Sequence, residues 1–267
     1  MKRLCAAAGV SRASYYRSQV GRVPLAKSMA LRAELQTIAL QFPAYGYRRI
    51  TPELQRRGHA VNHKRVLRLM RADNLLCLRR KSFVRTTDSE HGWPVYPNLA
   101  AEMETTGRNQ LWVADITYIR LQREFVYLAV VLDAWSRRVV GWALGETLEA
   151  ELTVTALRMA IEQRRPQPGL VHHSDRGLQY ACGAYRALLE RHGLRGSMSR
   201  KGNPYDNAFA ESFIKTLKHE EVYRNDYRDR NEALAGIGEF IERVYNQQRL
   251  HSALGYRTPT EFEAVPA

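Results

Sequence analysis

The sequence is poor in cysteine and has no feature of a membrane or secreted protein. Its three cysteines, Cys5, Cys77 and Cys182, are odd in number and far apart, with no C-x-x-C pair. This argues against a disulfide framework and a cysteine zinc site, and it suits a reducing cytoplasm. No apolar run approaches the ~18 residues of a membrane span, and no signal-peptide pattern opens the chain. We therefore expect a cytoplasmic protein without a membrane partner.

Acidic residues are scarce in the first part of the chain. Residues 1–100 hold 19 Lys/Arg against 5 Asp/Glu, whereas residues 101–267 hold 22 of each. The whole formal charge of +14 therefore lies in the first 100 residues. A basic surface kept only for solubility would not require such segregation. Attraction to a polyanion, with affinity supplied by counterion release from phosphates, explains it better.

Three carboxylates stand where an active site would be built. Asp115 interrupts an apolar, β-prone run over 111–119, and Asp175 closes a second such run over 170–175. Glu211 lies inside a helical stretch over 207–218. Three converging carboxylates would repel one another and take up protons unless a cation balanced them. Oxygen-only ligands favour Mg²⁺ or Mn²⁺, and a pair of such ions is suited to in-line phosphoryl displacement.

At these residues the chain resembles the DDE recombinases, with 59 residues between the aspartates and 35 between Asp175 and Glu211. More narrowly, it resembles the second-frame (OrfB) product of bacterial insertion-sequence transposases with a retroviral-integrase-type core. A D-D-E spacing alone is a weak signal, but four blocks in the right order are specific. They are residues 112–119, 173–177 and 202–213, and a tail block over 245–259.

The resemblance implies an α/β protein: a ribonuclease-H-like integrase core with a mixed five-stranded sheet, preceded by a small all-α helix-turn-helix region. In that fold the first and fourth strands are neighbours, which brings Asp115 near Asp175. The implied activity is DNA transposition, in which transposon ends are cut and the freed 3′-OH is joined to another DNA strand. It also implies two Mg²⁺ or Mn²⁺ ions per site, a nucleoid location, a homo-oligomer of at least a dimer on double-stranded DNA, and pairing or fusion with an upstream-frame product.

Two other functions remain open from the sequence. The first is a non-catalytic DNA-binding regulator, which would have no physical reason to keep three carboxylates together. The second is a nuclease acting on RNA–DNA hybrids, which two helix-turn-helix candidates make less favourable than duplex DNA. The absence of a G-x-x-x-x-G-K-[ST] loop agrees with strand exchange that needs no nucleotide fuel.

The pattern divides the chain into five segments. We expect a helix-turn-helix-like segment and helix over 1–40, a second helix-turn-helix over 41–77 and a basic linker over 78–107. The catalytic core then occupies 108–225 and a helical tail 226–267. Expected strands lie at 111–119, 124–133, 138–144, 170–174 and 195–199, with helices at 149–164 and 183–192. In the tail, Thr258-Pro259-Thr260-Glu261 is a capping box that starts a helix carrying Phe262 into the core.

Helix signals are clearest in the basic region. Ser11 is a good N-cap for 12–17 after a stop at Gly9, and an apolar stripe follows over 28–42. In the second helix-turn-helix, Gly58 ends one helix and Asn62 caps the next. We expect Ile50 and Leu54, and then Val66, Leu67 and Met70, to face inward. The outward residues suited to phosphates or base edges are His63, Lys64, Arg65 and Arg68.

Further DNA contacts are expected around the core. They are Arg79, Arg80 and Lys81 in the linker, Arg200 and Lys201 in the loop before the Glu211 helix, Lys215 and Lys218 on that helix, and Arg249 in the tail. Lys218 lies seven residues after Glu211, about 11 Å along the axis. We therefore expect it to contact the DNA end without affecting the metal site.

Some polar residues compete with the proposed ligands. Asp133 also ends an apolar run, but a turn-capping role or an ion pair with Arg137 or Arg138 is the simpler assignment. His172 and His173 are adjacent on a strand and point to opposite faces, which disfavours a shared zinc ion. Core packing and a supporting hydrogen bond are the expected roles of the histidines.

Overall fold

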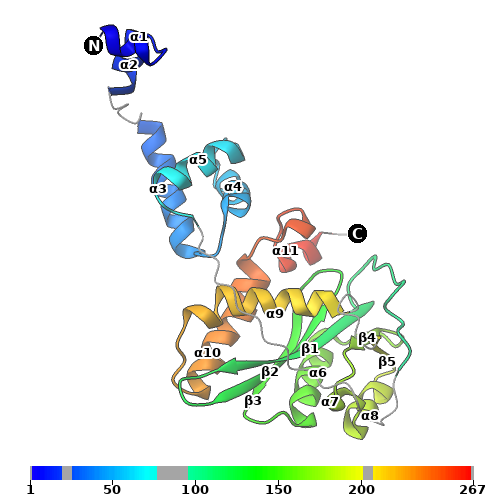
Figure 1. Ribbon diagram of the computed structural model, residues 1–267. Coiled ribbons are helices and arrows are strands. Elements are labelled where there is room, and N and C mark those ends of the chain that lie inside the picture. Colours follow the sequence, from blue (N-terminus) through cyan, green and yellow to red (C-terminus); the bar gives the residue numbers. More distant parts are fainter. Residues whose placement is uncertain (1, 20–25, 77–95, 201–206, 266–267) are drawn as a thin grey trace. The chain divides into compact units, whose positions relative to one another are not determined.

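The computed structural model describes residues 2–19, 26–76, 96–200 and 207–265, and the chain divides into two units, Met1–Cys77 and Leu78–Ala267. The first unit is helical and the second is built on a β-sheet (Figure 1). None of the described helices is both long enough and apolar enough to cross a membrane.

The described helices of the first unit are α1 (Lys2–Ala7), α2 (Arg12–Gln19), α3 (Ala26–Gln41), α4 (Tyr47–Arg56) and α5 (His63–Ala72). Helix α4 packs against both α3 and α5. The three helices contribute fully buried side chains, namely Leu35, Ile38, Ile50, Leu54, Val66 and Met70. This arrangement confirms the expected small all-α region.

The turns of the first unit follow the sequence signals. The Asn62 side chain accepts a hydrogen bond from the backbone N–H of Arg65 at 2.9 Å, and Gly58 takes a φ of +87°. The expected inner face of α5 is wrong at one position, because Leu69 is buried and Leu67 is only half-buried. Leu69 lies three residues after Val66 and so shares its face, whereas Leu67 is rotated away from it.

Five strands form one mixed sheet in the order β3-β2-β1-β4-β5, which confirms the expected fold. Strand β2 is antiparallel to β1 and β3, and β4 is parallel to β1 and β5. Each expected strand lies within about one residue of its observed bounds. The strands are β1 (Leu111–Arg120), β2 (Phe125–Asp133), β3 (Val139–Gly145), β4 (Val171–Ser174) and β5 (Arg195–Met198).

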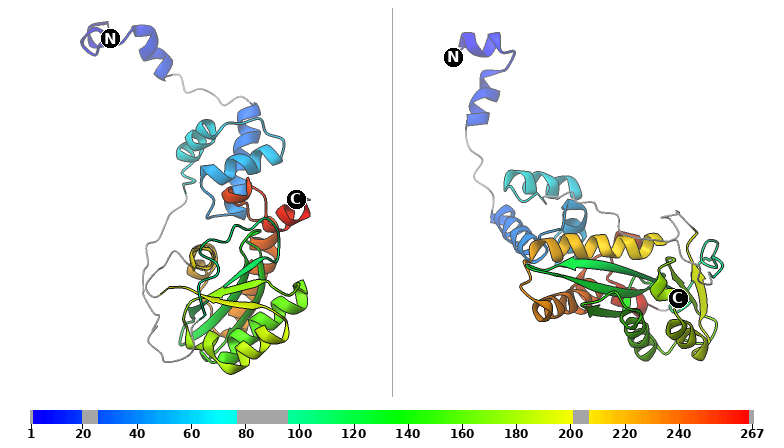
Figure 2. Two further views of the ribbon diagram at one scale, coloured as in Figure 1. Left: turned by 90° about the vertical axis from the view of Figure 1, so that its right-hand side faces the viewer. Right: turned by 60° about the horizontal axis from the view of Figure 1, so that its bottom comes forward.

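Helices cover both faces of the sheet (Figures 1 and 2). One face packs against α6 (Ala150–Arg164), the unexpected short helix α7 (Leu178–Ala181) and α8 (Gly183–Arg191). The other packs against α9 (Ala208–Glu220), η2 (Val222–Arg224), α10 (Arg230–Glu239) and the π-helical segment η3 (Phe240–Gln248). In β1, Leu111 and Val113 belong to the α9 side, and Trp112 and Ala114 to the α6 side. Asp115 continues the odd-numbered positions, so it points to the face that α9 covers.

Residues 96–103 pack on the sheet, although the sequence placed them in a linker. The backbone N–H of Leu99 donates to the Ser197 hydroxyl of β5 at 2.9 Å, and Met103 packs against the α9-side core. The ring of Tyr96 lies so close to Gly196 that a Cβ there would stand 2.8 Å from it. Part of the segment expected as a linker over 78–107 therefore belongs to the folded catalytic unit.

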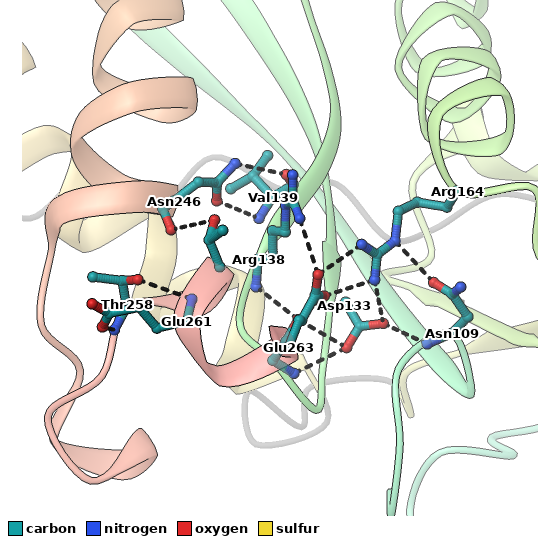
Figure 3. Close-up of polar contacts among 11 residues, drawn as sticks. Asn109, Asp133, Arg138, Val139, Arg164, Asn246, Thr258, Glu261 and Glu263 are labelled. Carbon is teal, nitrogen blue, oxygen red and sulfur yellow. Dashed lines mark hydrogen bonds and ion pairs between the residues drawn. The ribbon is translucent and has the colours of Figure 1, made fainter. Parts of the chain in front are cut away.

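The tail ends in η4 (Ser252–Leu254) and α11 (Pro259–Ala264), and the expected capping box is confirmed. The Thr258 hydroxyl accepts from the N–H of Glu261 at 3.1 Å, and the Glu261 carboxylate accepts from the N–H of Thr258 at 2.9 Å (Figure 3). Phe262 packs against the ring of Trp135, with the ring centroids 4.7 Å apart. Both rings are half-buried and neither belongs to the core clusters, so the expectation that Phe262 enters the core is wrong.

Glu263 anchors α11 to the sheet through a buried polar network (Figure 3). Its carboxylate accepts hydrogen bonds from Arg164 at 2.6 and 2.8 Å, from Arg138 at 3.0 Å and from Ser136 at 2.7 Å. Burial alone would raise the pKa of Glu263, but the hydrogen bonds from Arg164 and Ser136 outweigh it and hold the pKa below its usual value.

Asp133 belongs to the same network and caps the β2–β3 turn, as expected. It accepts from the backbone N–H groups of Trp135 and Ser136, both at 3.0 Å. Its ion-pair partner is Arg164, at 3.9 Å, so the expected pair with Arg137 or Arg138 is wrong. Arg137 instead places its guanidinium 4.0 Å from the centre of the Phe209 ring, while Arg138 is engaged by Glu263.

We predict that Glu263→Gln destabilises the protein by about 3–5 kcal/mol, because it removes the bidentate carboxylate from the buried guanidinium of Arg164 and leaves it only the more distant Asp133. Urea denaturation of both proteins tests this. The control is Glu239→Gln, which breaks an exposed pair with Arg243 and should cost less than about 1 kcal/mol. Equal losses in the two variants would contradict an anchoring role for Glu263.

Candidate active site

Asp115 lies in the middle of β1, where one backbone donor fixes its carboxylate. The N–H of Ile116 donates to Oδ1 at 2.9 Å. Burial and, next, the negative charge of Asp175 raise the pKa of Asp115 to about 8. The charge of Glu211 raises this pKa further, whereas the Ile116 hydrogen bond and the Lys218 charge lower it. At Asp115, burial and negative charge therefore outweigh the nearby positive charge of Lys218.

Asp175 follows the last residue of β4 and sits in a tight turn. The N–H of Gly177 donates to its Oδ1 at 2.9 Å, and a Cβ at position 177 would stand 3.0 Å from that oxygen. The turn is tied to β5 because Arg176 donates from Nε to the carbonyl of Ser199 at 2.8 Å. Glycine at 177 thus permits the close approach that orients Asp175.

Glu211 is delivered by the first turn of α9 and is exposed to solvent. The helix is held on the sheet by a row of buried residues, Ala210, Phe213 and Leu217. Burial still raises the pKa of Glu211 above its usual value. The Glu211 carboxylate is therefore the solvent-exposed member of the group.

The three carboxylates lie close enough for their charges to affect Asp115, but they do not converge on one point. Both Asp175 and Glu211 raise the pKa of Asp115 by their charge, so all three lie in one neighbourhood. In the part of the chain that the structure describes, no three His, Cys, Asp or Glu side chains are close enough together to hold one ion. The donor set nevertheless fits Mg²⁺ or Mn²⁺, since it offers only oxygen atoms and carries uncompensated negative charge.

The two histidines have hydrogen-bonding roles in the core. His172 accepts or donates at 3.1 Å to the Tyr185 hydroxyl, and burial lowers the pKa of His172 to about 3. His173 uses both ring nitrogens, with Nδ1 2.8 Å from the Ser197 hydroxyl and Nε2 3.0 Å from that of Ser199. The supporting hydrogen bonds expected of His173 are therefore made to serines in and directly after β5.

Lys218 lies nearer the carboxylates than its spacing from Glu211 indicates. It is half-buried, its Nζ stands 4.4 Å from the centre of the Tyr118 ring, and its charge lowers the pKa of Asp115. Burial lowers the pKa of Lys218 itself. The charge of Lys218 therefore acts on Asp115, although Lys218 lies about 11 Å from Glu211 along the helix axis, because a lysine side chain is long.

Arg249 does not lie where DNA could contact it. Its side chain is 5% exposed and forms a bidentate ion pair with Glu220, at 2.7 and 2.9 Å. We therefore withdraw Arg249 from the expected DNA contacts. Other expected contacts are exposed: His63, Lys64, Arg65, Arg68, Arg200 and Lys215. Arg79, Arg80, Lys81 and Lys201 lie outside the described residues.

The sequence reasoning missed two residues beside the carboxylates. Tyr180 in α7 is buried, and among the described residues its hydroxyl has no hydrogen-bond partner. Burial and then the charge of Asp175 raise its pKa well above the usual value, so the hydroxyl lies near that carboxylate. Asn207, at the N-terminus of α9, donates from Nδ2 to the carbonyl of Ala114 at 3.1 Å. Its only sequence signal was a position four residues before Glu211.

Comparison with known proteins gives consistent matches along the chain. Residues 105–204 and 192–259 match integrase core domain models, and residues 27–83 match an HTH-like domain model. The chain is 42% identical to an uncharacterized 31 kDa protein of insertion element IS600 from Shigella sonnei, over 97% of both chains. It is 36% identical to the transposase InsF for insertion sequence IS3A of Escherichia coli, over 98% of this chain and 93% of that one.

Among solved structures, the chain is similar in fold to a chain in the simian T-cell lymphotropic virus intasome bound to the PP2A regulatory subunit B56 gamma. The TM-score is 0.52 and the sequence identity 16%, with 87% of this chain and 75% of that chain covered. At this identity the likeness concerns the fold.

Because its pKa is raised, Asp115 should make the stability of the folded protein depend on pH in metal-free buffer. The pKa is about 8 in the folded protein and 3.8 in the reference state, so between these values the folded protein holds a proton that the unfolded chain has lost. Stability therefore falls as pH rises from about 4 to about 8. Asp115→Asn removes this loss, and each pKa unit is worth about 1.4 kcal/mol.

Thermal unfolding with EDTA tests this. We expect the Tm of Asp115→Asn to exceed that of the wild type by at least about 4 °C at pH 8.5, since about 1 kcal/mol shifts Tm by roughly 2–4 °C in a domain of this size. The difference should shrink toward pH 5. Exposed Asp226→Asn is the control. A difference independent of pH would contradict the assignment.

Proposed function

Because the chain belongs to the transposase family that includes InsF of insertion sequence IS3, we propose that Asp115, Asp175 and Glu211 catalyse its DNA cleavage and joining. The observation that carries this proposal is that Asp115, on the sheet face that α9 covers, lies close enough to Asp175 and Glu211 for both of their charges to raise its pKa. A divalent cation is the partner such a group requires, and we propose a pair of Mg²⁺ or Mn²⁺ ions.

Bound at these carboxylates, such ions supply charge that acidifies the attacking hydroxyl and stabilises the leaving oxygen. The protein's part is to hold the ligands in place. Asp115 is oriented by the N–H of Ile116 and Asp175 by the N–H of Gly177. Lys218 adds a positive charge that favours the ionised form of Asp115.

The chemistry is a direct in-line exchange of phosphodiester bonds. In cleavage, water attacks the phosphorus, the bond to the 3′ oxygen breaks, and the 3′ oxygen takes up a proton. In joining, the freed 3′-OH attacks a phosphorus of the target strand, so one P–O bond forms as another breaks. No covalent enzyme intermediate and no nucleotide fuel are needed.

We further propose that the basic first unit binds double-stranded DNA, namely transposon terminal repeats. Helix α5 supports this because His63, Lys64, Arg65 and Arg68 are all exposed while Val66, Leu69 and Met70 are buried. Arg200, Lys215 and Lys218 are proposed contacts near the scissile phosphate. Two transposon ends are served by a homo-oligomer of at least a dimer, paired with or fused to an upstream-frame product.

A non-catalytic DNA-binding regulator is disfavoured on physical grounds. Retaining a carboxylate with a pKa of about 8 beside two others destabilises the folded chain at neutral pH. Incubation of the protein with labelled transposon ends and Mg²⁺, followed by sequencing of joined products, distinguishes the two functions. A regulator would yield a shifted DNA band and no joined product.

Substitution of the carboxylates tests the proposed site. Asp115→Asn, Asp175→Asn and Glu211→Gln should each abolish cleavage and joining, because each removes a charged oxygen ligand, while affinity for the DNA end stays within about threefold of the wild type. The control Glu239→Gln should join normally. Wild-type joining by any of the three variants would remove that residue from the site.

The DNA-binding proposal is tested by salt dependence. Replacing Lys64, Arg65 and Arg68 together by Gln should reduce the slope of log K against log salt by about 0.9 for each phosphate that the variant no longer neutralises. The control replaces Arg158, Arg191 and Arg195 by Gln; these residues are also exposed and the change in net charge is the same. Equal slopes for the two triple variants would contradict a DNA contact by α5.

A further inference from the structure

Asn207 connects the helix that carries Glu211 to the strand that carries Asp115. It is the residue before α9, it is 5% exposed, and its Nδ2 donates to the carbonyl of Ala114 at 3.1 Å. Ala114 directly precedes Asp115 in β1. One side-chain hydrogen bond thus joins the local backbones of two proposed catalytic carboxylates.

The carbonyl that Asn207 meets lies where β1 and β4 separate. The N–H of Val171 donates to the carbonyl of Gln110 at 3.0 Å, so the even-numbered carbonyls of β1 point toward β4. The pairing of the two strands ends at Val113 and His173. The next carbonyl on this edge belongs to Ala114. It has no partner in β4 and accepts a hydrogen bond from the Asn207 amide instead, one residue before Asp115.

The side chain serves this strand and not its own helix. An Asn at the N-terminus of a helix usually accepts from a backbone N–H of the first turn, but Asn207 makes no such cap. Glu211 lies four residues later and thus one turn along the same face of α9. Fixing Asn207 against β1 therefore sets where Glu211 stands relative to Asp115.

Comparison with Asn246 shows that stability alone does not explain this contact. Both polar atoms of Asn246 bond to the backbone of Val139, each at 3.0 Å. The Oδ1 of Asn207 is buried and, within the described part of the chain, has no hydrogen-bond partner. A buried acceptor without a donor lowers stability, so such a position calls for another explanation.

We propose that Asn207 is a positioning residue that fixes the spacing between Asp115 and Glu211, and so the geometry of the divalent metal site. This rests on the proposed function of the three carboxylates. Asn207 contacts neither metal nor DNA in this role. It acts through the first turn of α9, which its hydrogen bond holds against the open end of β1.

The experiment uses the full chain in four forms: wild type, Asn207→Ala, Asn207→Ser and Asn246→Ala. Mn²⁺ affinity is measured without DNA, from the paramagnetic resonance signal of the free ion. Hydrogen exchange over residues 208–211, thermal unfolding, DNA-end affinity and the joining rate are measured alongside. Asn246→Ala is the matched control because it removes the same amide from another strand contact, with no carboxylate of the site attached to it.

We expect Asn207→Ala to weaken Mn²⁺ binding by about 10–100-fold, the range found when residues that orient metal ligands are removed. Joining should slow by about 100-fold, as for a displacement near 1 Å, with DNA-end affinity unchanged. Exchange over 208–211 should rise. Asn246→Ala should lower Tm with Mn²⁺ affinity within twofold of the wild type. Asn207→Ser, which keeps a small polar side chain, should show the same loss of Mn²⁺ affinity. It replaces the alanine variant in the experiment if that variant does not fold.

If the wild type binds Mn²⁺ and the folded Asn207 variants bind it equally well, the positioning role is overturned. The proposed function of the carboxylates then stands. Equal losses of Mn²⁺ affinity in the Asn207 and Asn246 variants would also overturn the positioning role, because the effect would then be general destabilisation. Failure of the wild type to bind Mn²⁺ or to join DNA would instead overturn the proposed function on which the role rests.

Discussion

The early end of the β1–β4 pairing is the constraint on which the catalytic unit depends. Strand β1 runs on to Arg120, but its parallel pairing with β4 ends at Val113 and His173. Beyond this point the two strands separate, and Asp115 and Asp175 are the first acidic residues on either side. At this opening, burial and then the negative charge of Asp175 raise the pKa of Asp115.

Asp133, at the other end of the same sheet, shows how backbone donors and a cation can stabilise a buried aspartate. Asp133 accepts hydrogen bonds from three backbone N–H groups and pairs with Arg164, which also binds Glu263. Among the described residues, Asp115 has a single backbone donor and two carboxylate neighbours. Both aspartates end or interrupt apolar strands in the sequence. The two aspartates therefore differ in the partners that the fold brings to each.

The sequence predicted what depends on local pattern. Strand bounds, the Asn62 cap and the Thr258–Glu261 capping box follow from alternation and from hydrogen bonds between near neighbours, and all are found. Apart from Leu67 in α5, the failures involve partners distant in the chain. Arg249 was expected on DNA but pairs with Glu220, and Leu99, expected in a linker, bonds to Ser197 of β5. Asn207 was missed because its partner, Ala114, lies 93 residues away. The roles of Asp115, Asp175 and Glu211 remain predictions from the resemblance, supported by their placement.

The burial of Arg249 gives the tail motif a role at the catalytic helix. Glu220 is the last residue of α9, and its bidentate pair with Arg249 ties that end of the helix to the tail, while Asn207 ties the first turn to β1. Between them, Ala210, Phe213 and Leu217 form a buried apolar row on the sheet. Polar contacts thus hold both ends of α9, and apolar packing holds its middle. The pair of Arg249 with Glu220 therefore fixes the C-terminal end of the helix that carries Glu211.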